Sequence, residues 1–130
     1  MCGICGIFNF DNSAVSRNVL LRMNNTMIHR GPDGGDLHID ANLGLGHRRL
    51  SIIDLSTGDQ PMSSSDGLVT IVFNGEIYNF QELKALLETK GHCFQTRSDT
   101  EVIIYAYKEW GEDFVSRLRG MFAIALWDKR

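Results

Sequence analysis

The sequence is short of cysteine, of long hydrophobic runs and of excess charge, and each shortage excludes a class of protein. Its three cysteines are an odd number, which suits a reducing, cytoplasmic setting better than a disulfide framework. The longest strongly apolar run, residues 121–127, falls far below the roughly 20 residues that cross a bilayer. A net charge of −3 argues against nucleic acid or an anionic membrane as partner. The 130 residues, 43% of them hydrophobic, suffice for one globular domain with a buried core.

Cys2 and Cys5 form a C-x-x-C pair, a spacing found in zinc and redox sites. No second pair of ligands follows at a matching spacing, so we expect no metal. A redox motif of this kind opens a helix, whereas residues 4–10 have the composition of a strand. Residues three apart in a strand point to opposite faces, so the two thiols should not meet. We therefore expect Cys5, like Cys93, to be a small core residue.

Hydrophobic spacing, capping residues and turn signals predict strands and helices that do not alternate strictly. Strands are expected at residues 4–10, 37–39, 43–50, 68–73 and 121–127, the last of them buried on both faces. Helices are expected at residues 15–28, from a capping box at 79–82 to Gly91, from a second capping box at 98–101 to Gly111, and at 112–118. Residues 51–66 should be mostly irregular, and Asn74-Gly75 is the strongest hairpin signal. The mixture favours an α+β layered domain with largely antiparallel sheets.

Cys2 stands directly after the initiator methionine. This methionine is trimmed when the next side chain is small, so we expect Met1 to be removed, which leaves a thiol and a free α-amine on one residue. An α-amine has a pKa of about 7.7–8.0, against about 10.4 for lysine, so a useful fraction of it is the neutral base near pH 7. A terminal cysteine therefore carries its own general base and needs no histidine. A small residue at position 2 also occurs by chance, so Cys2 alone does not establish catalysis.

Five short motifs follow one another along the chain. They are MCGICGIF at residues 1–8, RGPD at 30–33, RLSIID at 49–54, NGEIYN at 74–79 and SDTE at 98–101. Each motif alone is a weak signal. In this order and spacing they resemble the glutamine amidotransferase domain of the glutamine-hydrolysing asparagine synthetases, which are class II amidotransferases within the N-terminal nucleophile hydrolases.

The resemblance covers residues 1–130 and implies a type 2 glutamine amidotransferase domain. The fold it implies is a four-layer αββα sandwich of antiparallel sheets. We expect the domain to be truncated at its C-terminus, because the chain stops at residues 128–130 directly after a predicted strand. The family's synthetase domain, which resembles an ATP pyrophosphatase, is absent, so ATP and magnesium are expected for that missing domain and no cofactor for this one.

The resemblance also implies roles for individual residues. Cys2 would be the nucleophile, and the Asn74 side chain and Gly75 N–H would stabilise the oxyanion. Arg49 would bind the α-carboxylate of glutamine, a task suited to its planar fork, and Asp99 would accept from the α-ammonium group. The backbone expected to line the same pocket belongs to Leu50, Ser51, Ile52, Ile53 and Glu76.

Plainer interpretations stand beside these roles. Asn74-Gly75 can be a turn, with or without an oxyanion role, because glycine adopts positive φ freely. Asp99 fits the first turn of a helix, where a carboxylate favours the helix dipole. Arg48 and Arg49 should point to opposite sides of a strand, so only one can face a pocket. The four histidines, at positions 29, 38, 47 and 92, are scattered, which argues against a catalytic histidine.

The implied function is hydrolysis of L-glutamine to glutamate and ammonia. Ammonia would pass to the synthetase domain of the same parent chain for ATP-dependent amidation of aspartate to asparagine. Residues 74–79 favour this branch over the phosphosugar and phosphoribosyl branches. The alternatives are a related amidotransferase with another acceptor and a noncatalytic, truncated module that binds or regulates. Expected partners are L-glutamine, the synthetase domain and, in a homodimer, a second copy, with no nucleic acid and no membrane.

Overall fold

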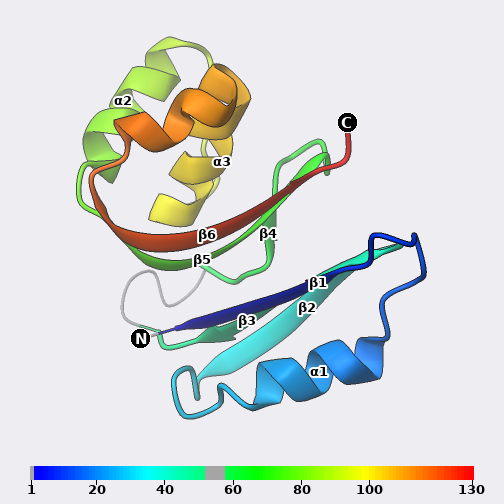
Figure 1. Ribbon diagram of the computed structural model, residues 1–130. Helices are drawn as coiled ribbons and strands as arrows, with labels where there is room; N and C mark the ends of the chain where they lie inside the picture. Colours follow the sequence, from blue (N-terminus) through cyan, green and yellow to red (C-terminus); the bar gives the residue numbers. More distant parts are fainter. Residues whose placement is uncertain (1, 52–57) are drawn as a thin grey trace.

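Two three-stranded sheets lie face to face, and helices cover the outer side of each (Figure 1). This computed structural model describes residues 2–51 and 58–130. Its elements are β1 (Gly3–Phe8), α1 (Arg17–Asn25), β2 (Gly34–Asp40), β3 (Leu43–Arg49), β4 (Met62–Ser63), β5 (Val69–Ile77), α2 (Phe80–Thr89), α3 (Asp99–Trp110), the 3₁₀ helix η1 (Gly111–Arg117) and β6 (Gly120–Asp128). All paired strands among them are antiparallel, so the predicted α+β, αββα architecture is confirmed.

The first sheet has the order β1-β3-β2 and is built, with α1, from residues 3–49. Alternate residues of its central strand β3 face different layers. Leu43 and Leu45 pack toward the second sheet. Gly44 and Gly46 face α1, and a Cβ on Gly44 would come within 2.8 Å of Leu20. These glycines therefore let the helix approach the sheet closely.

α1 is shorter at both ends than the helix predicted at residues 15–28. Val15 lies before the helix, where its N–H donates to Ala41 O at 2.9 Å. At the other end the chain enters turns after Asn25, and Thr26 Oγ1 donates to Met23 O at 2.7 Å. Asparagine and threonine side chains compete with the helical backbone for hydrogen bonds, which explains the early end.

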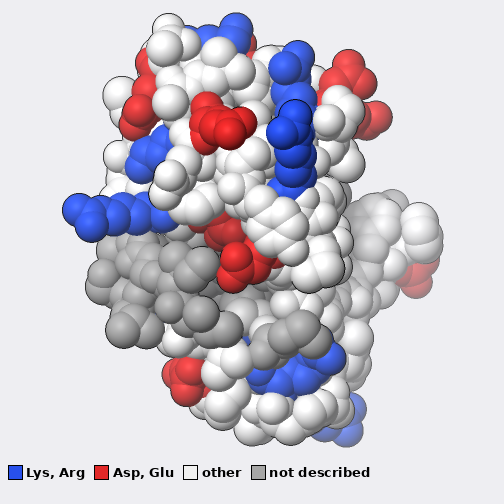
Figure 2. Space-filling model, turned by 90° about the vertical axis from the view of Figure 1, so that its left-hand side faces the viewer, with Lys and Arg blue, Asp and Glu red and all other residues white. Residues whose placement is uncertain are grey.

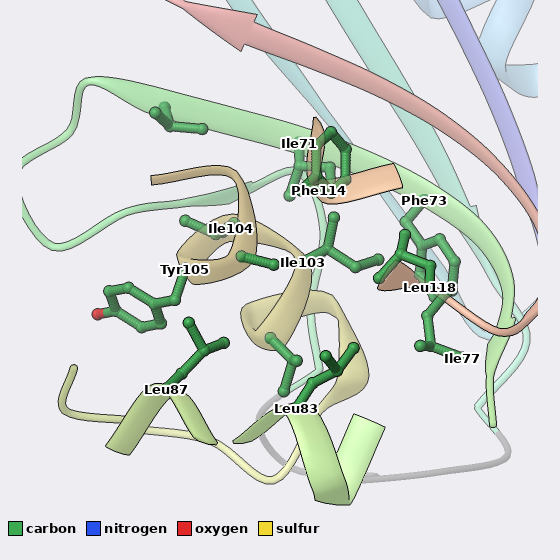
Figure 3. Close-up of a cluster of buried hydrophobic side chains, with 13 residues drawn as sticks. Ile71, Phe73, Ile77, Leu83, Leu87, Ile103, Ile104, Tyr105, Phe114 and Leu118 are labelled. Atoms are coloured by element: carbon green, nitrogen blue, oxygen red, sulfur yellow. The ribbon is translucent and has the colours of Figure 1, made fainter. Parts of the chain in front are cut away.

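The second sheet has the order β4-β5-β6 and is built, with α2, α3 and η1, from residues 62–128. Its outer face forms the larger hydrophobic core, where Ile71 and Phe73 of β5 meet Leu83 and Leu87 of α2 and Ile103 of α3 (Figure 3). Full burial of each such side chain stabilises the folded state by roughly 1.5–3 kcal/mol. This core therefore supplies most of the driving force that holds β5 in place.

The contact between the two sheets is smaller. Leu43 and Leu45 of β3 meet Val72 of β5 there, and Trp127 packs against the cluster. Trp127 Nε1 also donates to Asp40 Oδ2 at 2.8 Å, which ties the end of β6 to the end of β2. The sheets are thus joined mainly at the end where β6 finishes.

The predicted turn at Asn74-Gly75 is wrong. β5 continues through both residues, which pair with β6. Gly75 has a φ of 149°, and a Cβ at this position would lie 2.1 Å from Met121 O. Glycine is therefore required by the close approach of β6 and by the positive φ, not by a tight turn.

The two predicted capping boxes mark real helix starts, but their hydrogen bonds differ from the prediction. The Asn79 side chain bonds to the backbone on either side of Leu118 and does not cap α2. Ser98 does cap α3, because its Oγ accepts from Thr100 N–H at 3.1 Å. Glu101 accepts instead from the backbone N–H groups of residues 95–96. The side chains of Asn79 and Glu101 therefore bond to backbone groups outside the helices that they were predicted to cap.

Two further expectations need correction. β6 is not buried on both faces: Met121 is 71% exposed, because β6 is the outer strand of the described sheet. Cys93 is exposed in the connection between α2 and α3, whereas Cys5 is half-buried against α1. Where residues 51–66 are described they are mostly irregular, as expected, apart from the two-residue strand β4.

Candidate active site

A cavity of about 440 Å³, hereafter the pocket, opens where the two sheets meet the start of α3. Its volume is typical of small-molecule sites. The predicted site residues that line it are Cys2, Arg49, Leu50, Asn74, Gly75, Glu76 and Asp99. Ser51 is next to this wall but does not line it, and the predicted residues Ile52 and Ile53 lie outside the described residues. The fold thus assembles four segments that are distant in sequence.

Charges of both signs line the pocket. On the side of the molecule where the chain begins, acidic atoms gather at mid-height and basic atoms lie below them (Figure 2). Among the lining residues, Glu76 and Asp99 are acidic and Arg49 is basic. Such a combination suits a small ligand that carries an ammonium and a carboxylate group, as a free amino acid does.

Cys2 precedes β1 and is held at the pocket by two neighbours. Leu50 N–H donates to its Sγ at 3.3 Å, and Arg30 Nε donates to its carbonyl oxygen at 3.1 Å. The Leu50 backbone therefore touches the group predicted to act as nucleophile.

The motif at residues 30–33, for which the sequence suggested no chemical role, forms hydrogen bonds that hold neighbouring segments in place. Besides Arg30, Gly31 accepts from Arg48 Nε at 2.9 Å through its carbonyl oxygen. Asp33 Oδ2 accepts from Ser51 N–H at 2.8 Å. The loop thus holds both Cys2 and the segment that follows β3.

Arg49 ends β3 and lines the pocket, while Arg48 points to the other side of the strand, as predicted. Arg49 is 8% exposed, and its Nη1 bonds to Asp59 Oδ1. The Asp59 side chain is 86% exposed. A buried guanidinium at a cavity wall is suited to bind a carboxylate, and here a carboxylate of the chain itself is already in contact with it.

β5 passes the pocket with one edge paired to β6 and the other edge toward α3. At this second edge, Phe73 N–H donates to Gln60 Oε1 at 2.6 Å and Ile77 N–H donates to Asp99 Oδ2 at 3.2 Å. N–H groups of alternate residues in a strand point to the same edge. Residues 73 and 77 follow this alternation, and Asn74 and Gly75, which lie between them, line the pocket.

Asp99 is the first residue of α3 and also lines the pocket, so its position fits both a role at the helix start and a role in substrate binding. Burial, and secondarily the nearby Glu76 carboxylate, raise the pKa of Asp99 above its ordinary value, while N–H groups of the backbone oppose this shift. A carboxylate that is destabilised by burial gains from a cation placed beside it. The site is therefore suited to an ammonium group.

A family model described as "Glutamine amidotransferase domain" matches residues 1–130. The chain belongs to this family. It is 46% identical over 132 residues to asparagine synthetase [glutamine-hydrolyzing] 1 of Bacillus subtilis (strain 168), covering 99% of this chain and 21% of the relative. It is also 46% identical over 131 residues to asparagine synthetase [glutamine-hydrolyzing] 2 of Oryza sativa subsp. japonica, covering all of this chain and 22% of the relative. The amidotransferase chain thus spans about a fifth of the length of these curated relatives.

A solved structure supports the fold of the amidotransferase chain. The glutamine phosphoribosylpyrophosphate amidotransferase from B. subtilis, complexed with ADP and GMP, superposes with a TM-score of 0.78. It is 23% identical and covers 98% of this chain and 35% of its own. At this identity the likeness establishes the α+β fold of the N-terminal nucleophile hydrolases and nothing finer.

His47 is a lining residue of the amidotransferase pocket that the sequence analysis did not place there. It is 1% exposed, and burial together with the positive charge of Arg49 lowers its pKa to about 4, so it is neutral near pH 7. Within the described residues its Nε2 has no hydrogen-bond partner. The period-two alternation that puts Leu45, His47 and Arg49 on one face of β3 could have located it.

The remaining lining residues were also missed. They are Gly58, Gln60, Phe73, Ser98, Thr100, Met121, Phe122 and Ala123.

Within residues 2–51 and 58–130 there is no group of His, Cys, Asp or Glu side chains that could hold a metal ion. No helix in this part of the amidotransferase chain is long and apolar enough to span a membrane.

Proposed function

We propose that this amidotransferase domain hydrolyses L-glutamine to L-glutamate and ammonia with Cys2 as the nucleophile. The observation that carries the proposal is the single pocket shared by Cys2, Arg49, Asn74 and Asp99, which are far apart in the sequence. Hydrolysis of this amino acid needs a nucleophilic thiol and an amide donor for the oxyanion. It also needs a guanidinium and a carboxylate for the charged groups of the substrate.

The proposed chemistry begins once Met1 has been removed. The α-amine of Cys2 takes the thiol proton, and the thiolate attacks the side-chain amide carbon of glutamine. The C–N bond then breaks, the ammonium form of the α-amine returns the proton to the departing ammonia, and a thioester remains. Water, deprotonated by the same amine, attacks the thioester, releases glutamate and restores the thiol.

Each step passes through a tetrahedral intermediate whose oxygen is negatively charged. We assign its stabilisation to the Asn74 side chain and the Gly75 N–H, which belong to the part of β5 that lines the pocket. The rigid pairing of β5 with β6 supports this assignment, because preorganised donors stabilise charge without rearranging.

We assign recognition of the substrate's two charged groups to opposite walls. Arg49, from the first sheet, would bind the α-carboxylate, and Asp99, from α3, would accept from the α-ammonium group. Arg49 is buried and Asp99 is half-buried, which supports this assignment, because charge pairs are stronger where water is excluded.

We further propose that the ammonia serves a ligase reaction, the ATP- and magnesium-dependent amidation of aspartate to asparagine, in a synthetase domain of the parent protein. The names of the B. subtilis and O. sativa relatives, and the fraction of their length that this chain spans, support this parent. No residue of this chain is assigned to ATP or magnesium. Three free thiols fit a cytoplasmic setting.

A glutaminase assay on the full-length protein tests the proposal. Intact mass first establishes that Met1 is absent, and glutamate release from glutamine is then measured for the wild type and for Cys2→Ala. We expect turnover in the wild type and none above background in the variant. A folded, Met1-free wild type that releases no glutamate contradicts the proposed function.

A further inference from the structure

Gln60 lies in the pocket wall, where its side-chain amide joins two elements. Its Oε1 accepts from Phe73 N–H at 2.6 Å, and its Nε2 donates to Thr100 Oγ1 at 3.3 Å. Phe73 directly precedes Asn74, and Thr100 directly follows Asp99. One amide group therefore links the neighbours of two residues that the proposed function places on the substrate.

The geometry of the second sheet explains why a side chain, and not a neighbouring strand, accepts the hydrogen bond from Phe73 N–H. β4 pairs with β5 only at Met62 and Ser63, opposite Ile71 and Thr70. Beyond that point the edge of β5 has no strand beside it within the described residues, yet Phe73 is 4% exposed and its N–H needs a partner. The amide oxygen of Gln60 takes the place of the missing strand carbonyl.

A second bond completes the pattern. Asp99 Oδ2 accepts from Ile77 N–H, so the edge of β5 is fixed both before and after residues 74–76. These residues carry the two proposed oxyanion donors, which therefore lie between the two bonds along β5. The edge of β5 that faces the pocket is therefore held by two side chains rather than by a neighbouring strand.

We propose that Gln60 is a positioning residue, which holds the Asn74–Gly75 donors of β5 and the start of α3 at a fixed separation across the pocket. This inference rests on the proposed glutaminase function. Gln60 acts through Phe73 and Thr100 and takes no part in the bond changes. A shift of the donors by about 1 Å lowers the rate of a positioned reaction by up to about 10²-fold.

The test is kinetic. Gln60→Met keeps the length of the side chain but removes both hydrogen bonds, and we expect kcat for glutamine hydrolysis to fall at least about ten-fold. Gln81→Met, on the exposed side of α2, is the matched control and should leave kcat unchanged. Rates are normalised to the Cys2 thiols titrated in each sample, so that loss of folded protein does not count as loss of kcat.

A double-mutant cycle separates positioning from a general structural role. In an Asn74→Ala background one of the two donors is already gone, so Gln60→Met should lower kcat by a clearly smaller factor than in the wild-type background. An equal loss in both backgrounds, or an unchanged kcat in the single variant, overturns the inference. If Gln60→Met does not fold, Thr100→Val removes one of the two bonds and should show the same dependence on Asn74. A wild type without turnover contradicts the proposed function instead.

Discussion

Asn74 is the residue whose replacement reports most directly on the proposed chemistry. Asn74→Ala removes one oxyanion donor while β5 keeps its pairing with β6. We expect kcat for glutamine hydrolysis to fall by about 10²–10³, with a smaller effect on KM. Asn25→Ala, an exposed asparagine at the end of α1, is the control and should behave as wild type. Near-normal turnover of Asn74→Ala would remove this residue from the oxyanion site.

Asp59 presents a carboxylate to the guanidinium that we assign to the substrate's own carboxylate. Its negative charge opposes a second anion at Arg49, so Asp59→Asn should lower KM for glutamine, by about two- to five-fold for such an exposed partner. Steady-state kinetics provide the measurement. Asp66→Asn, which removes an exposed carboxylate paired with Lys108, should leave KM unchanged. A raised KM for Asp59→Asn would mean that Asp59 orients Arg49 rather than competing with the substrate.

His47 makes stability depend on pH. Its pKa is about 4 in the folded protein and about 6.5 when unfolded, so between these values the unfolded chain binds more protons. The free energy of unfolding therefore falls as the pH drops from about 6.5 to 4, by roughly 3 kcal/mol for this residue. Urea unfolding across this range should show a shallower pH dependence for His47→Gln than for wild type. Equal slopes would contradict burial of a neutral imidazole.

At the scale of residues, sequence reasoning located the groups that carry reactive chemistry. Cys2, Arg49, Asn74 and Asp99 do line one pocket, although their roles stay predictions. It did not find Gln60, because an amide that bonds to Phe73 N–H and Thr100 Oγ1 depends on contacts between elements that no local pattern encodes.

At the scale of elements, the approach of β6 to β5 determines what residue 75 can be. In Gly75→Ala the new Cβ would clash with Met121 O, and the alanine backbone would be held at an unfavourable φ. We therefore expect the free energy of unfolding, measured in urea, to fall by at least about 2 kcal/mol. Gly34→Ala adds a Cβ where no atom lies within 4 Å and should cost far less. Equal stability of the two variants would contradict the close pairing of the strands.

Element types were predicted well and element ends poorly, for physical reasons. The hairpin signal at Asn74-Gly75 was overridden by pairing with β6, which local turn preference does not sense. Helix α1 ended early because the Thr26 side chain competes with the helical backbone, donating from Oγ1 to Met23 O. β6 resembled a buried strand in composition but lies at the edge of the described sheet. For Asn74-Gly75 and β6 the tertiary arrangement, which is absent from the local sequence, decided the outcome, whereas the end of α1 was decided by a local hydrogen bond.

At the scale of the whole molecule, Trp127 joins the two sheets. Trp127→Phe retains most of the ring but removes the bond from Nε1 to Asp40 Oδ2, so stability should fall by about 1 kcal/mol in urea unfolding. A double-mutant cycle with Asp40→Ala, which removes the acceptor, isolates the pair, and the two changes should be clearly non-additive. Strict additivity would show that the bond does not contribute.

The division of the chain into two sequential layers has a consequence for synthesis. Residues 3–49 form one sheet with its helix, and residues 62–128 form the other. The ribosome therefore releases a complete first layer that bears Cys2 and Arg49 before Asn74 and Asp99 exist. Residues of both layers line the pocket, so the proposed glutaminase activity requires the two layers to be docked and is lost when they part.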